Sequence, residues 1–406
     1  MDNIPIRIAT LGNVDSGKST LIGVLSENTL DNGNGLARKC IFNHPHEQET
    51  GRTSSISNIY CNINNKKIIF TDLCGHEKYF KTTMFGLNLI NPDYCFVIIG
   101  ANMGIQKMTR EHLGIISALQ FPIIIIVTKI DIAPDNVLND TINNLEKLIK
   151  AAKKTPLHID ANTPVNIFKK FIPIIKVSNV NGTGIDILRT YLSKLNVKKK
   201  YSIIDLESQK EKVEFLIDYC YNVHGVGLVL SGSLNKGSIK VGDHLFLTTQ
   251  KSSELTEVSI KSIFDNEDNK VDKVIAGEHC TINIKEVNKK KQLKRKMITY
   301  GNVLVSENNK KMHTDFIADV YILHHQTTIT QKSEKKNGFQ PIIHTNGVRQ
   351  AAEIIKIYND NGVLRAHDRS RIHFRFLFNK EYIKPKSKFI FREGTSRGIG
   401  MIIDVM

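Results

Sequence analysis

The chain has 406 residues, of which 41% are hydrophobic and 24% are charged. This length is too great for one ordinary core, so two or three globular domains are expected. No apolar run reaches the ~18 residues of a membrane span, and the N-terminus lacks the form of a signal peptide. We therefore expect neither a membrane protein nor a secreted one.

The net charge is +16, and the excess of basic residues is shared equally between residues 1–200 and 201–406. A charge spread in this way favours a polyanionic partner such as RNA over a merely solubilising surface. The six cysteines include no C-x-x-C pair. This spacing argues against a zinc cluster or a disulfide framework, and a reducing cytoplasm is the expected compartment.

Residues 4–196 alternate apolar runs with helical patterns, which predicts a mostly parallel sheet covered by helices. The expected strands are 6–11, 67–72, 94–100, 123–128 and 172–177. The expected helices are 17–25, 78–86, 109–119, 137–150 and 185–195.

After residue 212 the pattern changes to short apolar runs broken by Gly and Asn, as at 226–231, 244–247 and 258–263. Such runs are typical of β-barrels or sandwiches. A basic run at 289–296 and a polar stretch at 307–311 indicate a boundary. We predict an α/β domain at 1–200 and two all-β domains at 210–300 and 310–406.

The first strand is followed by Gly12-Asn13-Val14-Asp15-Ser16-Gly17-Lys18-Ser19, which fits the phosphate-loop pattern G-x-x-x-x-G-K-[ST]. The glycines let backbone N–H groups surround a phosphate, and the helix that follows adds its positive end. Lys18 is expected to reach the β- and γ-phosphates, and Ser19 to place its hydroxyl on Mg²⁺. Thr20 is included in the nucleotide-binding set. This motif alone does not separate GTP from ATP.

The second motif, D-x-x-G, ends the strand at 67–72 and reads Asp72-Leu73-Cys74-Gly75. A carboxylate there can hold Mg²⁺, and Gly75 can offer its N–H to the γ-phosphate without hindrance from a side chain. An ordinary turn at the end of a strand is the alternative. The place of the motif, between the phosphate loop and a base-reading motif, favours the functional interpretation.

The third motif, Thr128-Lys129-Ile130-Asp131, is close to the guanine-reading pattern N-K-x-D. A buried carboxylate at Asp131 would accept from N1–H and the amino group of guanine, and adenine would leave it unpaired at a high cost. Lys129 is expected to lie along the base. Thr128 replaces the usual asparagine, and its shorter hydroxyl can keep fewer hydrogen bonds. Weaker candidates for backbone contacts to the base follow the last strand, at Ser178 and Asn179.

Together these motifs resemble those of translational GTPases such as elongation factor Tu and elongation factor 1-alpha, and in particular the eukaryotic GTP-binding protein 1 subfamily. The phosphate loop and the run Asp72-Leu73-Cys74-Gly75-His76-Glu77 carry the resemblance. Four further stretches are similar to that subfamily, at 30–38, 51–55, 323–328 and 391–394. The similarity thus extends over nearly the whole chain.

The resemblance implies a GTPase domain followed by two β-barrels. It makes Thr53 a second side-chain ligand of Mg²⁺, beside Ser19, and His76 the residue that positions the attacking water. Two residues depart from the family pattern: Cys74 replaces a proline, and Arg52 replaces an apolar residue. We expect these changes to alter the sensor loop and the apolar screen around His76.

The expected activity is hydrolysis of GTP to GDP and phosphate, slow until a partner accelerates it. By resemblance that partner is the ribosome, and the protein either delivers aminoacyl-tRNA or acts on stalled ribosomes as a cytoplasmic monomer. The alternative is a regulatory RNA-binding switch that recruits an RNA-degradation partner and for which turnover is incidental. A third possibility, an ATP-using enzyme, is opposed by Asp131. The basic run at 289–296 either contacts RNA or is a solvated linker.

Overall fold

The computed structural model describes residues 4–39, 57–79, 83, 86–87, 92–160, 163, 170–197, 213–249, 255–265, 268–288, 293–299, 301–306, 312–324, 328–333, 337–345, 347–394 and 396–406. The chain separates into two compact units, Met1–Lys200 and Tyr201–Met406. We describe each unit by itself. None of the helices in the described ranges is long and apolar enough to cross a membrane.

The first unit is built on a seven-stranded sheet with the order β2-β3-β1-β4-β5-β7-β6. All its neighbouring strands are parallel except β2 and β3, which pair antiparallel. The strands are β1 Ile6–Gly12, β2 Ser57–Ile63, β3 Lys66–Asp72, β4 Tyr94–Gly100, β5 Ile123–Thr128, β6 Thr155–His158 and β7 Phe171–Lys176. The mostly parallel sheet expected from the sequence is confirmed.

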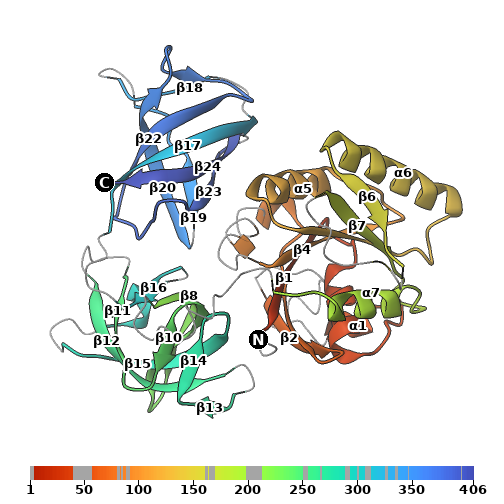
Figure 1. The fold of residues 1–406 in the computed structure, drawn as a ribbon, viewed down its shortest axis with the longest axis horizontal. Helices are drawn as coiled ribbons and strands as arrows, with labels where there is room; N and C mark the ends of the chain where they lie inside the picture. The colour runs from red at the N-terminus through yellow and green to blue at the C-terminus, as the bar shows by residue number, and fades with distance from the viewer. Residues whose placement is uncertain are drawn as a thin grey trace. The chain divides into compact units, whose positions relative to one another are not determined.

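Helices cover both faces of this sheet, with α1 and α7 on one side and α5 and α6 on the other (Figure 1). The helices are α1 Lys18–Glu27, α2 Leu36–Lys39, α5 Lys107–Leu119, α6 Asp135–Ala151 and α7 Ile185–Ser193. Apolar residues of α1 and α7 pack on alternate residues of β1, β4 and β5 in one core. The helix expected at 78–86 begins as the short 3-10 helix Glu77–Tyr79, and most of the remainder lies outside the described residues.

The second unit contains two separate β-structures. In the first, pairing runs β11-β16-β8-β9-β15-β12, and β12 pairs again with β11, which closes the ring. Its elements are β8 Glu214–Val223, β9 Gly227–Lys236, β10 Ser238–Lys240, β11 His244–Leu247, β12 Thr256–Phe264, β13 Lys270–Val271, β14 Lys273–Ile275, β15 His279–Glu286, η3 Arg295–Met297 and β16 Val303–Val305. Strand β16 therefore extends this structure past the expected boundary at residue 300.

The second β-structure is a closed barrel with the order β17-β22-β20-β19-β23-β24. Its strands are β17 Asp315–His324, β18 Ile329–Thr330, β19 Ile342–Thr345, β20 Val348–Tyr358, β21 Val363–Leu364, β22 Arg369–Phe376, β23 Lys388–Glu393 and β24 Ser396–Val405. Stacked and edge-on phenylalanines fill its core, among them Phe316, Phe374 and Phe389. The expected division into three domains, with boundaries at residues 200–210 and 300–310, stays a prediction.

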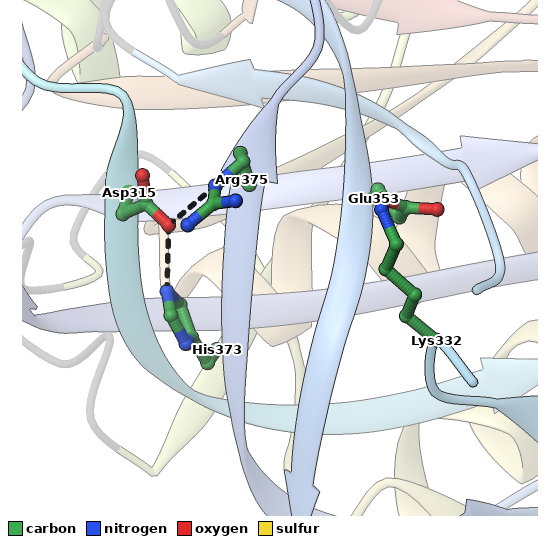
Figure 2. Close-up of polar contacts among 5 residues, drawn as sticks. All are labelled: Asp315, Lys332, Glu353, His373 and Arg375. Carbon is green, nitrogen blue, oxygen red and sulfur yellow. Dashed lines mark hydrogen bonds and ion pairs between the residues drawn. The ribbon is translucent and has the colours of Figure 1, made fainter. Parts of the chain in front are cut away.

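Ion pairs join neighbouring elements of this barrel (Figure 2). Asp315 of β17 accepts hydrogen bonds from His373 at 2.8 Å and from Arg375 at 2.9 Å, both on β22. Glu353 of β20 accepts from Lys332 at 2.9 Å and from the Gly338 backbone at 3.2 Å. Each carboxylate is therefore paired where the barrel wall partly removes it from water.

Candidate functional site

The three sequence motifs come together at one edge of the first sheet. Strand β1 pairs with β3 on one side and β4 on the other, so the loop after β1 lies where the strand order reverses. In open parallel sheets this crevice, outside the carboxyl ends of the strands, is where ligands bind. The three motifs follow β1, β3 and β5, and the residues after β7 reach the same edge.

The phosphate loop has a backbone that only particular residues can adopt. Gly12 and Gly17 have φ of 153° and 83°. A Cβ on Gly12 would lie 2.3 Å from the carbonyl oxygen of Ile98, so no larger residue fits there. Within the loop, the Ser16 hydroxyl donates to the Asn13 carbonyl at 2.9 Å. Asp15 is exposed, while Asn13, Val14 and Thr20 are half-buried.

Lys18 lies beneath this loop and is only 7% exposed. Its Nζ donates to the Asn13 carbonyl at 2.8 Å. Burial lowers the pKa of Lys18, and the carboxylate of Asp72 opposes that shift. The negative charge of a bound phosphate would therefore compensate for the water that the buried ammonium group has lost.

Asp72 joins the phosphate loop to the sensor motif. Its side chain is 1% exposed, and one oxygen accepts from the Ser19 hydroxyl at 2.5 Å. The other accepts from the Thr10 hydroxyl of β1 at 3.1 Å. A hydroxyl and a carboxylate in contact are hard oxygen donors of the kind that Mg²⁺ prefers. The third expected ligand, Thr53, lies outside the described residues, as does Arg52.

Gly75 of the sensor loop lies directly against the phosphate loop. A Cβ there would be 2.5 Å from Lys18 Nζ and 2.7 Å from the carbonyl oxygen of Gly12. Cys74 is buried, and its carbonyl accepts from the Thr83 hydroxyl at 2.7 Å. The side chain of Cys74 thus fills the interior, and only a residue without a side chain fits at Gly75 beside the lysine.

His76, the residue expected to position water, is exposed next to Gly75. Its Nδ1 accepts from the Lys78 backbone N–H at 3.1 Å, and the Tyr79 ring lies edge-on at 6.1 Å. With Nδ1 used as an acceptor, the neutral imidazole carries its proton on Nε2. The free nitrogen is then a donor.

On the base side, the hydroxyl of Thr128 lies near two backbone carbonyls, which the sequence alone did not indicate. It is fully buried, and its hydroxyl lies 2.6 Å from the Ser16 carbonyl and 3.3 Å from that of Ile99. It therefore fastens β5 to the phosphate loop. The stem of Lys129 lies near the end of β4. Its Cδ and the Cα of Ser16 in the phosphate loop are each 3.8 Å from the position that a Cβ on Gly100 would take.

Asp131 is exposed, whereas the sequence argument assumed a buried carboxylate. Within the described part of the chain it makes no hydrogen bond. The burial that would make its pairing selective must therefore come from the bound base itself.

The loop after β7 completes the edge. The Ser178 hydroxyl accepts from the backbone N–H groups of Val180 and Asn181, each at 3.2 Å, which shapes the turn. Asn179 is 6% exposed, and its carbonyl accepts from the Asp31 N–H at 2.8 Å. Both expected residues thus reach the site, and Asn179 brings a buried side chain as well as its backbone.

Asp31 is a structural residue that sequence reasoning missed. Its carboxylate accepts from the backbone N–H groups of Gly33, Gly35 and Ala37 at 3.0 to 3.2 Å. It therefore forms the turn after α1 and caps α2. An aspartate followed by two glycines at alternate positions was the available signal.

Comparison with known proteins agrees with this geometry. The family described as the elongation factor Tu GTP binding domain matches residues 4–219. GTP-binding protein 1 of Xenopus laevis is 35% identical over 100% of this chain and 64% of its own length. GTP-binding protein 2 of Homo sapiens is 35% identical over 99% of this chain and 69% of its own.

Among solved structures, translation elongation factor SelB from Methanococcus maripaludis, in complex with the GTP analogue GppNHp, matches with a TM-score of 0.72. The match covers 100% of this chain and 80% of that one at 20% identity. At this identity the likeness concerns the fold, which is a GTPase domain with β-rich domains after it.

Proposed function

The chain belongs to the family of the elongation factor Tu GTP-binding domain, and on this premise we propose that it binds and hydrolyses GTP as a switch in translation. The observation that carries the proposal is the junction of phosphate loop and sensor loop. Ser19 meets Asp72 at 2.5 Å, and Gly75 leaves space for only a hydrogen atom above Lys18. A γ-phosphate would contact both the phosphate loop and the sensor loop here. Its loss on hydrolysis would therefore remove a contact of the sensor loop.

The residues fit the expected chemistry of phosphoryl transfer to water. Lys18 would neutralise charge on the phosphates, and the N–H of Gly75 would hold a γ-phosphate oxygen. Ser19 and Asp72 would hold Mg²⁺, which supplies charge neutralisation between the phosphates when it is bound. His76, with a donor Nε2, would orient the attacking water in line with the γ-phosphate. None of these residues is a strong base, and the reaction requires positioning more than basicity.

RNA contact is the second part of the proposal, and at least partly exposed aromatic residues paired with cations support it. On β8 the Tyr219 and Tyr221 rings are 4.5 Å apart, and the Arg295 guanidinium lies 5.5 Å above the Tyr219 ring. On the closed barrel, Arg369 lies 5.0 Å above Tyr321. Aromatic faces next to cations can stack bases and bind phosphates.

Arg295 also bears on the basic run at 289–296. Its side chain donates to the carbonyl of Cys220 at 2.9 Å and to the Tyr219 hydroxyl at 3.1 Å. The described end of this run is therefore fixed on β8 and is not a free linker. Lys294, Arg295 and Lys296 are exposed there, and we propose that this end contacts RNA.

We assign the switch to delivery of aminoacyl-tRNA or to action on stalled ribosomes in the cytoplasm. The name of the related SelB structure, a translation elongation factor, motivates the first possibility. The alternative is a GTP-controlled RNA-binding protein that recruits an RNA-degradation partner. Because both use the same GTPase site, the distinction must come from the partner.

The decisive experiment measures GTP turnover alone, with ribosomes and with isolated subunits. We expect a slow intrinsic rate that intact ribosomes raise at least about tenfold, since positioning by a partner accelerates related switches by far more. An unchanged rate with ribosomes would remove the translational assignment. Protection of the aminoacyl ester by the GTP form would support delivery, and absence of protection would favour the RNA-recruiting alternative.

A further inference from the structure

Asn179 is buried, with only 6% of its surface exposed. Its amide oxygen is buried without a hydrogen-bond partner among the residues that the structure describes. The backbone of Asn179 is held by Asp31, so the residue is fixed in place by contacts that do not involve its amide. Buried amides are nearly always hydrogen-bonded, so an amide that the described residues leave unbonded beside a ligand site is available to the ligand, to which its Nδ2 can donate two N–H groups.

The amide lies next to Thr128 and the phosphate loop. A Cβ built on Gly17 would be 3.5 Å from Asn179 Nδ2 and 3.5 Å from Thr128 Oγ1. The two side chains therefore flank one point at the start of α1. The loop after β7 thus brings the amide of Asn179 close to the point that the hydroxyl of Thr128 also approaches.

The hydroxyl of Thr128 has no hydrogen left to donate to a nucleotide base. It has one hydrogen, and its nearer acceptor is the Ser16 carbonyl at 2.6 Å. An asparagine, the usual residue at this position, would carry two N–H groups and could serve both the loop and a ligand. The exchange to threonine keeps the bond to the loop and gives up the second donor.

Guanine requires donors on this side. Its N7 and O6 accept hydrogen bonds, while Asp131 can pair only with N1–H and the amino group on the other edge. We propose that the side-chain amide of Asn179 donates a hydrogen bond to N7 of guanine and so replaces the amide that Thr128 lacks. The inference rests on the GTP binding proposed above and adds a base-binding residue to that site.

The test compares GDP with 7-deaza-GDP, in which carbon replaces N7 and every other polar atom of the base is kept. For the full-length protein we expect the 7-deaza nucleotide to bind about tenfold more weakly, the effect of one hydrogen bond. Asn179→Ala should weaken GDP by about the same factor and bring the ratio of the two dissociation constants to near one. Asn179→Asp keeps the shape of the side chain but removes its donors, so it should abolish the ratio as well.

Two further variants separate base contact from loop structure. Asn181→Ala is the matched control, because Asn181 is an exposed asparagine in the same loop whose side chain accepts only from the Thr183 N–H. It should keep the tenfold ratio of the unmodified protein. In the double variant Thr128→Asn with Asn179→Ala, the smaller residue 179 leaves space for an amide at 128, and the ratio should return.

A ratio near one in the unmodified protein would overturn the inference without any variant. So would an Asn179→Ala protein that binds both nucleotides more weakly but keeps the original ratio, because the amide would then only support the loop. If the double variant bound GDP and 7-deaza-GDP equally well, an amide at position 128 would not replace the proposed hydrogen bond from position 179 to N7. All three outcomes leave GTP binding intact, whereas failure of the unmodified protein to bind GDP would overturn the proposed function itself.

Discussion

On the phosphate side of the site, the polar side chains already hold one another. Lys18 donates to the Asn13 carbonyl, and Asp72 accepts from Ser19 and Thr10. On the base side, Asp131 is exposed, and the amide oxygen of Asn179 is buried without a partner in the described residues. The phosphate-binding groups are therefore arranged in the loop before the nucleotide binds, whereas the base-binding groups acquire their partners only from the bound base.

The largest effect should come from the base side, through Asp131→Asn. An amide presents a donor where guanine also presents donors, so GTP affinity should fall by about a thousandfold. Xanthine has a carbonyl in place of the amino group, and the variant should bind XTP better than GTP. Competition between the two nucleotides measures this directly, with Asp135→Asn in the first turn of α6 as the control. A variant that still prefers GTP would show that Asp131 does not read the base.

His76→Ala should have the next largest effect, and it tests the phosphate side. Ribosome-stimulated hydrolysis should fall by about a hundredfold, because the water would lose its orienting donor. GTP affinity should change little, since an exposed side chain adds little to binding. Single-turnover hydrolysis beside equilibrium binding separates the two effects, with Lys78→Ala as the neighbouring control. Equal losses of binding and hydrolysis would contradict the role given to His76.

Ser19→Ala tests whether the contact between Ser19 and Asp72 marks the Mg²⁺ site. Affinity for GTP in the presence of Mg²⁺ should fall about thirtyfold, the effect of one lost bond to a charged group. Repeating the measurement with a chelator should remove most of that difference. Ser26→Ala, on the same helix and bonded only to its own turn and its neighbour, should bind GTP normally. A loss that is independent of Mg²⁺ would indicate that Ser19 only supports the loop.

Asp31→Ala should have the smallest effect, because this residue acts on the base side only through the Asn179 backbone. Loss of a carboxylate that caps a turn costs about 1–2 kcal/mol locally. We expect GDP to dissociate about fivefold faster, as the loop after β7 loses its brace. Displacement of a fluorescent GDP measures the rate, and Asn32→Ala in the same turn is the control. An unchanged rate would show that the base side does not depend on this brace.

The sequence predicted those parts of the fold that depend on periodic burial. The run Ile123–Thr128 is fully buried and became β5 with the expected bounds. The short edge strand Thr155–His158 was not predicted, because it is half exposed and has no apolar run. Edge strands depend on a neighbour for their hydrogen bonds, and one local sequence does not reveal that neighbour.

The candidate site shows the same division. The residues of the phosphate loop could be named because their spacing is dictated by a single phosphate. The approach of both Asn179 and Thr128 to Gly17 could not, since these residues lie on segments that follow different strands and have no fixed spacing. Likewise the exposure of Asp131 depends on which elements surround it, not on the motif that contains it.

The crowding at Gly17 also limits which residues can occur together at positions 128 and 179 in related proteins. Two polar side chains from distant segments lie against the same glycine, so an exchange at either position alters the space left to the other. Positions 128 and 179 should therefore covary among homologues, with asparagine at 128 accompanied by a small residue at 179.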